Sequence, residues 1–287
     1  MDNPIKTHQM DRSRRLYQRP VLGILLVLVL YLMTATISEF LVRSLVGNNE
    51  GAGVLLKFSI FSLLVFIIIP LLLKLPRGNV SFSKYLEAIG LRTRIPIGRI
   101  ILLALSCYFI FAVIQLSGSL IYYSTHPGKY VLDLSRHSLL GSGSVISGIF
   151  EEIVLRGVIV AILLGAFPKV KAVMISAVIF ACLHLLNMLN PEYTTVWVLA
   201  QTVWAFGLGL IYAYLFVTTQ TIWPPIVLHY LINGMVGVWM RGLDGQDLTS
   251  ALYGIPFFGL LPAGLAILWG RYLWKHWEST NQALSEC

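Results

Sequence analysis

A long uncharged stretch limits what this chain can fold into: between Tyr193 and Met240 the sequence contains no Asp, Glu, Lys or Arg. A helix that crosses a bilayer needs about 20 mostly apolar residues. The stretch is therefore long enough for two such helices joined by a short turn. Over the whole chain 57% of residues are hydrophobic and 12% are charged, whereas soluble domains carry about 25% charged residues. So few charges cannot cover a water-facing surface, and we expect a surface that faces lipid.

Apolar windows of this length predict an all-α, polytopic membrane helix bundle of about eight transmembrane helices. The predicted spans are 20–42, 54–74, 99–123, 143–166, 170–190, 194–217, 222–240 and 252–273. This map gives a basic tail at 1–19, a single transmembrane bundle at 20–275 and a C-terminal tail at 276–287. The first apolar run is longer than the roughly 7–15 residues of a signal-peptide core, so we expect it to be retained.

The net charge of +8 comes from basic residues that lie between apolar segments. Nucleic-acid binding would need them on one soluble face, so we exclude it. They gather in the N-terminal tail, the 74–99 connection, the turn after the fourth span and the C-terminal tail, and the opposite side holds only Arg43, Lys129, Arg136 and Arg241. Cytoplasmic loops carry the excess of Lys and Arg, so we expect both termini to be cytoplasmic. The lack of a soluble domain favours a bacterial inner (plasma) membrane.

The polar connection 76–98 is too hydrophilic to cross a membrane. Its pattern fits a short amphipathic helix lying on the cytoplasmic face. It fits an ordinary basic loop equally well, and the sequence leaves both open.

Three ionisable side chains interrupt the fourth predicted span: Glu151, Glu152 and Arg156. Each costs about 2.5–3.5 kcal/mol near the middle of a bilayer, so such residues usually face a protein interior or a water-filled cavity. Glu152 and Arg156 share a helix face and can pair, either to lock helix packing or to support a functional site. Glu151 is rotated by about 100° from Glu152. It is the freer carboxylate, suited to act as a general base or a proton carrier.

Two histidines lie in other apolar spans, each with a partner one helical turn away. Phe180 precedes His184 in the fifth span, and Asn233 follows His229 in the seventh. A lone histidine in a helix is usually a packing residue, but two at membrane depth favour a shared site. His229 lies only a few residues after Trp223. The turn before His229 must therefore be recessed, or the helix tilted, if the two histidines are to meet.

These residues form three motifs on three separate spans. The motifs are EExxxR at Glu151 to Arg156, FxxxH at Phe180 to His184, and HxxxN at His229 to Asn233. With them the chain resembles the type II CAAX prenyl protease and bacteriocin-processing (CPBP, Abi) family of glutamate-type intramembrane proteases, with a catalytic core at about 143–240. The resemblance implies an endopeptidase that hydrolyses a peptide bond of a membrane-embedded or lipidated peptide or protein.

The resemblance also implies roles for the residues of the motifs. Glu151, assisted by His184, would activate a water, and His229 with Asn233 would hold the oxyanion that forms at the scissile carbonyl. The supporting residues would be Glu152, Arg156 and Phe180.

Metal dependence is a separate question, because the family is also described as metalloproteases. Zinc, if present, would be held by Glu151, His184 and His229. Asn is a poor zinc ligand and Arg156 opposes a divalent cation, so the sequence favours a mechanism without a cofactor.

Two functions of other classes stay open. A proton-coupled transporter could use the same acidic and imidazole groups as a relay, although the sequence has no internal repeat of the kind found in many transporters. The other is a non-catalytic membrane scaffold or immunity protein that kept the motifs.

Overall fold

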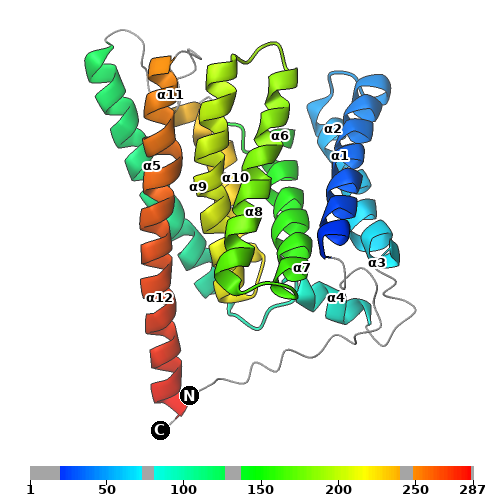
Figure 1. Ribbon diagram of the computed structural model, residues 1–287, viewed down its shortest axis with the longest axis vertical. Coiled ribbons are helices and arrows are strands. Elements are labelled where there is room, and N and C mark those ends of the chain that lie inside the picture. Colours follow the sequence, from blue (N-terminus) through cyan, green and yellow to red (C-terminus); the bar gives the residue numbers. More distant parts are fainter. Residues whose placement is uncertain (1–19, 73–80, 127–136, 240–247, 286–287) are drawn as a thin grey trace.

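The computed structural model describes residues 20–72, 81–126, 137–239 and 248–285, and every regular element within them is a helix. The predicted basic tail at 1–19 lies outside these residues. Helical rods stand side by side and alternate in direction (Figure 1). In chain order the rods are α1 (Pro20–Leu45); α2, η1 and α3 (Glu50–Leu63, Leu64–Ile68, Ile69–Leu72); α5 (Ile97–Thr125); α6, η4, η5 and α7 (Ser142–Ile146, Ser147–Glu151, Ile153–Val160, Ala161–Leu164); α8 and η6 (Lys169–His184, Leu185–Leu189); α9 (Thr195–Thr219); α10 (Trp223–Trp239); and α11, η7 and α12 (Leu248–Gly254, Ile255–Leu260, Leu261–Ser285).

Six of these rods are long and apolar enough to cross a membrane. The two others are the fourth rod, residues 142–164, and α10. The fourth rod contains the three ionisable residues, and α10 has 17 residues, fewer than the roughly 20 of a full span. The predicted all-helical, multi-pass membrane fold is therefore confirmed. Eight crossings and cytoplasmic termini stay predictions. The rod that ends the bundle continues to Ser285, through most of the segment expected to be a tail.

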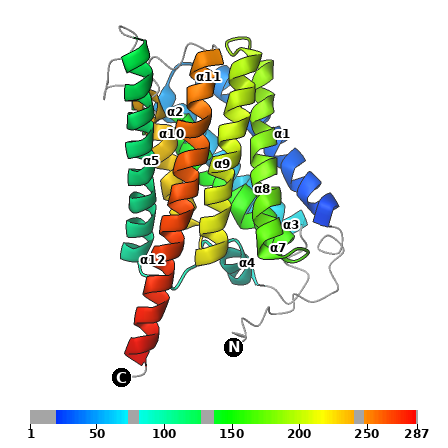
Figure 2. The ribbon, with the colours of Figure 1, turned by 60° about the vertical axis from the view of Figure 1, so that its left-hand side comes forward.

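The central helix of the bundle is α9. In its apolar window 61% of the residues are buried, against 28% in α1, α5 and α8. Two glycines allow close neighbours: a Cβ on Gly209 would lie 2.8 Å from Ala177 Cα of α8, and one on Gly207 would lie 2.9 Å from the backbone of Gly259 in η7. Small residues at such contacts let helix backbones approach closely. The rods that contact α9 are the fourth rod, α8 with η6, α10 and the last rod (Figure 2).

A short helix, α4 (Phe82–Ala88), lies across the end of the bundle where α9 turns into α10. Ser81 caps it by accepting a hydrogen bond from the Lys84 amide. The Tyr85 hydroxyl, which is buried, donates to the Val65 carbonyl at 2.9 Å. Of the two structures that the sequence left open for this connection, the helix is the one that forms.

The residues after α4 cover the turn between α9 and α10. The Gly90 carbonyl accepts hydrogen bonds from the Ile222 amide and the Thr221 hydroxyl, each at 3.0 Å. Gly90 has φ +75°, and a Cβ there would lie 2.7 Å from the Phe216 ring, so only glycine fits. Thr221 and Ile222 are fully buried. Part of the turn is therefore covered by the residues after α4, whereas Trp223 at the start of α10 is 40% exposed.

Candidate active site

A cavity of about 430 Å³ lies inside the bundle between the fourth rod, α5, α8, α9 and α10. Five residues predicted from the motifs line it: Glu151, Phe180, His184, His229 and Asn233. The structure thus brings together side chains from the fourth, fifth and seventh predicted spans. Apolar walls complete the cavity, among them Trp197, Trp204, Leu208 and Phe258.

The fourth rod departs from regular α-helix where it carries its charged residues. Residues 147–151 and 153–160 have π-helical hydrogen bonding, which is rare and frequent at functional sites, although η1 and η7 have it too. Gly148 lets this rod meet α10 closely, because a Cβ there would lie 2.8 Å from Tyr230 Cα. The neighbouring residue of α10 is His229, so this contact places the carboxylates of the fourth rod beside the imidazole.

Glu152 is fully buried and makes two charge-assisted contacts. Nη1 of Arg156 donates to its Oε1 at 3.0 Å, and Nδ1 of His229 donates to the same oxygen at 2.7 Å. The expected pairing of Glu152 with Arg156 is present. Its direct bond to His229 was not expected from the sequence, because the distance between two helices cannot be read from spacing along one of them.

The other imidazole nitrogen of His229 is also bonded. Nδ2 of Asn233 donates to Nε2 of His229 at 3.0 Å. The same amide group lies 3.4 Å from the Gly143 carbonyl, a long bond that engages its second N–H only weakly. Glu152, His229 and Asn233 therefore form a chain of hydrogen bonds that runs from the buried ion pair to the cavity.

His184 is held by its own helix. Its Nδ1 donates to the Phe180 carbonyl at 2.9 Å, which leaves Nε2 with the lone pair that can take up a proton. The edge of the Phe180 ring also packs against both imidazoles, with centroid distances of 4.8 Å to His184 and 5.8 Å to His229.

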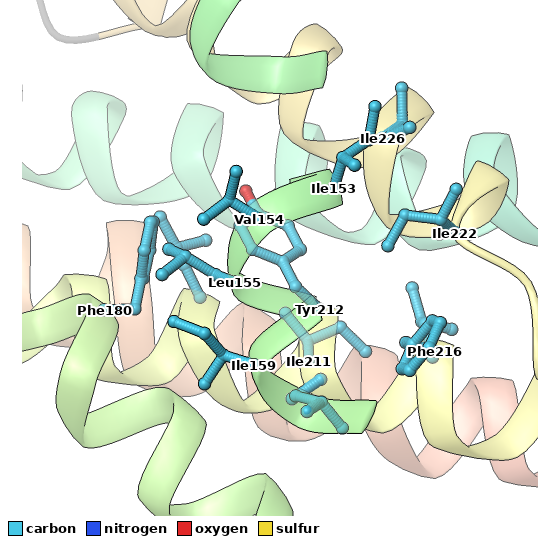
Figure 3. Packing of buried hydrophobic residues seen from close by; sticks show 14 of the residues in the cluster. Ile153, Val154, Leu155, Ile159, Phe180, Ile211, Tyr212, Phe216, Ile222 and Ile226 are labelled. Carbon is cyan, nitrogen blue, oxygen red and sulfur yellow. The ribbon is translucent and has the colours of Figure 1, made fainter. Parts of the chain in front are cut away.

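Aromatic rings surround the buried guanidinium. Cζ of Arg156 lies 4.3 Å from the Phe180 centroid and 5.1 Å from that of Tyr212. Tyr212 in turn stacks on His229, with centroids 4.8 Å apart and ring planes at 17°. Figure 3 shows Phe180 of α8 and Tyr212 of α9 among the apolar side chains packed around η5. The faces of aromatic rings attract cations. The rings of Phe180 and Tyr212 therefore help to stabilise the guanidinium charge of Arg156, which is removed from water.

Glu151 differs from Glu152 in its surroundings. Its side chain is only half-buried and lines the cavity. The Tyr31 hydroxyl of α1 is within hydrogen-bonding reach of its carboxylate. Of the two adjacent acids, Glu152 is therefore held by the buried network, and Glu151 faces the space where a substrate would lie.

A comparison with protein families gives one match at this site: residues 136–235 match the type II CAAX prenyl endopeptidase Rce1-like family. We call these residues the Rce1-like segment because of this similarity. It contains the three motifs and runs from just before α6 into α10, so the resemblance drawn from the motifs is confirmed over these residues. The family is described as a prenyl endopeptidase, in agreement with the class of enzyme that the motifs suggested. Comparisons with curated proteins and with solved structures gave no match.

Several residues at the site escape a search by motif. Tyr212 lies inside the Rce1-like segment, but an aromatic residue in an apolar span carries no special signal. Tyr31 and Gln115 lie outside that segment, on α1 and α5. Gln115 lines the cavity with a buried side-chain oxygen that has no hydrogen-bond partner. Gln115 could have been found from the sequence, because it is a polar amide within the third apolar span.

The Rce1-like site does not fit the zinc ligands considered from the sequence. In the part of the chain that the structure describes, no three His, Cys, Asp or Glu side chains are placed to hold a metal ion. Both ring nitrogens of His229 are bonded to protein groups, so a metal would have to displace Asn233 to bind this imidazole. We derive no step through a metal.

Proposed function

We propose that this protein is an intramembrane endopeptidase that cuts a membrane-embedded or lipidated peptide with a water activated by Glu151. The observation that supports it is the cavity itself, where Glu151 and His184 stand beside an imidazole and an amide joined in one network. The Rce1-like segment supports the same class of reaction. We further propose that the protein resides in a bacterial inner membrane.

In the first step the Glu151 carboxylate takes a proton from water while the water oxygen attacks the scissile carbonyl. His184 assists by orienting this water through Nε2, because its Nδ1 is fixed on the Phe180 carbonyl. General-base catalysis of this kind contributes about 10²–10⁴-fold to a rate.

Attack places negative charge on the carbonyl oxygen, which needs hydrogen-bond donors. Asn233 supplies its weakly engaged N–H. His229 donates from Nε2 once the Asn233 amide has turned away from it and the nitrogen has taken a proton from a second water in the cavity. This proton returns to water when the product leaves. The Glu152 carboxylate on Nδ1 stabilises the resulting imidazolium. When the C–N bond breaks, Glu151 returns its proton to the leaving amine, and the new carboxyl group is released.

The cavity walls indicate the kind of peptide that fits. Trp197, Trp204 and Phe258 offer apolar contacts, and Gln115 offers an amide to the peptide backbone. An extended segment with apolar side chains satisfies both. Such a segment is what a substrate in or near the membrane would present.

The purified protein in liposomes tests this proposal with a panel of fluorogenic membrane peptides. We expect cleavage by the wild type, loss of cleavage in Glu151→Gln, and full activity in Glu87→Gln, an exposed acid on α4 that serves as a control. Peptide cleavage that Glu151→Gln leaves unchanged would overturn the proposal. Proton flux that is lost in Glu151→Gln, with no cleavage by the wild type, would instead favour the transporter.

A further inference from the structure

The cavity is open at one end of the bundle and closed at the other. From Glu151 its lining extends to Ser138 and Gly143 before and in α6, and to Tyr193 between α8 and α9. Ser138, Gly143 and Tyr193 are exposed. Both ribbon views place the α6 start and the α8–α9 connection at the same end (Figures 1 and 2). We call it the open end.

At the opposite end, buried side chains separate the cavity from the surface. The turn between α9 and α10 lies there, with Thr221 and Ile222 fully buried and bonded to Gly90. The short helix α4 lies across this end (Figure 1). In the part of the chain that the structure describes, the lining of the cavity thus reaches exposed residues at the open end.

A second hollow of about 600 Å³ adjoins the cavity at the open end. The two share Ser138 and Gly143 as lining residues. The second hollow lies between the turn that joins α1 to α2 and the start of α6. Its lining includes the amide and charged side chains of Asn48, Asn49, Glu50 and Lys57. Together they form a groove with these side chains in its outer part and aromatic side chains near Glu151.

Charge distinguishes the two ends as clearly as shape does. Among the described residues the closed end carries the basic side chains Lys84, Arg92, Arg94, Arg99, Lys169, Lys171, Arg271 and Lys275, against the acidic Glu87 and Glu278. The open end carries Glu39, Glu50 and Glu192, and its cations Arg43 and Lys57 both bind Glu39, at 2.9 and 2.7 Å. Two connections that the structure does not describe, 127–136 and 240–247, contain three acidic and three basic residues between them. They therefore leave this difference in charge unchanged. Basic ends of membrane proteins face the cytoplasm.

We propose that the groove opens to the extracytoplasmic side, and that its substrate is an exported, membrane-anchored peptide. The bond that is cut lies near the outer surface of the membrane, with a polar segment in the outer hollow and an apolar one beside Glu151. The choice of substrate rests on the proposed function, whereas the direction of the groove does not depend on it.

A matched pair of glycines tests the direction. A Cβ on Gly143 at the open end or on Gly98 at the closed end would meet nothing within 4 Å, so cysteine fits at both. Each is introduced into a Cys107→Ala, Cys182→Ala, Cys287→Ser background and labelled with a membrane-impermeant maleimide. We expect Gly143→Cys to label at least about ten times faster than Gly98→Cys in bacterial spheroplasts, and the order to reverse in inverted vesicles. The reverse pattern, equal labelling of both, or no labelling of Gly143→Cys from either side would overturn the proposal.

An activity measurement separates this inference from the proposed function. In spheroplasts that display an anchored reporter peptide outside, the maleimide should block cleavage by Gly143→Cys and spare Gly98→Cys. If the two cysteines are labelled as expected but neither an outside nor a cytoplasmic reporter is cleaved, the result counts against the proposed protease activity. The proposed direction of the groove would still hold. Cleavage of the cytoplasmic reporter alone would overturn the inference and leave the protease intact.

Discussion

Nδ1 of His229 lies 2.7 Å from Oε1 of Glu152, an oxygen that also accepts a hydrogen bond from Arg156. One buried carboxylate oxygen therefore joins an ion pair within the fourth rod to an imidazole on α10. This contact suggests a specific role for Glu152, the second acid of the EExxxR motif. It fixes the ring of His229, and in the proposed mechanism it would stabilise the positive charge that the ring carries while the oxyanion forms.

The shared oxygen makes Glu152 important for stability as well as for activity. Glu152→Gln leaves Arg156 as a buried, uncompensated charge, and breaking such a pair costs about 3–5 kcal/mol. We expect a clear fall in the thermal unfolding midpoint in detergent. Adding Arg156→Met should recover most of the midpoint but none of the peptide cleavage. Recovery of cleavage in the double variant would mean that Glu152 acts on packing alone.

The proposed oxyanion contact predicts a kinetic signature for Asn233. Removing one oxyanion donor lowers kcat by about 10²–10³-fold. We therefore expect Asn233→Ala to lower kcat by this factor with little change in KM, because the contact strengthens only in the transition state. Steady-state kinetics with a membrane peptide measure both constants. A raised KM with an unchanged kcat would assign Asn233 to substrate binding instead.

The aromatic ring of Tyr212 should matter more than its hydroxyl. The ring stacks on His229 and lies against Arg156, whereas the buried hydroxyl has no partner. We expect Tyr212→Phe to leave stability equal or slightly higher, because it removes a buried polar group that has no partner among the described residues. Tyr212→Ala should cost about 3–5 kcal/mol, as other large-to-small changes in cores do. Thermal unfolding of the two variants compares them, and an equal loss in both would contradict this role of the ring.

The contact between α8 and α9 predicts a sharp effect of one methyl group. A Cβ on Gly209 would lie 2.8 Å from Ala177 Cα, and overpacking of this kind costs about 1–3 kcal/mol. Gly264 of α12 is the control, since a Cβ there would meet nothing within 4 Å. We expect Gly209→Ala to lower the unfolding midpoint and Gly264→Ala to leave it equal or higher. Equal midpoints for the two would mean that α8 and α9 are not in close contact there.

Much of this fold follows from the sequence because lipid demands long apolar helices. A helical rod occupies each predicted span, and the pairing of Glu152 with Arg156 follows from their spacing on one helix. The depth of His229 called for a recessed turn or a tilted helix. The sequence could not predict that the residues after α4 cover this turn, since the hydrogen bond between Gly90 and Ile222 joins segments far apart in the chain.

The site was less predictable than the fold. The motifs name residues on three spans, but not which nitrogen of His229 meets which acid. Contacts between helices depend on rotation and close approach, as at Gly148 against Tyr230. Local periodicity does not encode either quantity. Gln115 and Tyr31 join the site for the same reason, from helices that carry no motif.

The carboxylate of Glu151 can be tested most directly by chemical rescue. Glu151→Ala removes the proposed base and leaves space beside a cavity of about 430 Å³, enough for a small carboxylate such as formate. We expect Glu151→Ala to be inactive toward a membrane peptide, and formate to restore cleavage in a concentration-dependent manner while leaving Asn233→Ala inactive. Cleavage by Glu151→Ala at the wild-type rate without formate would contradict the role proposed for this residue.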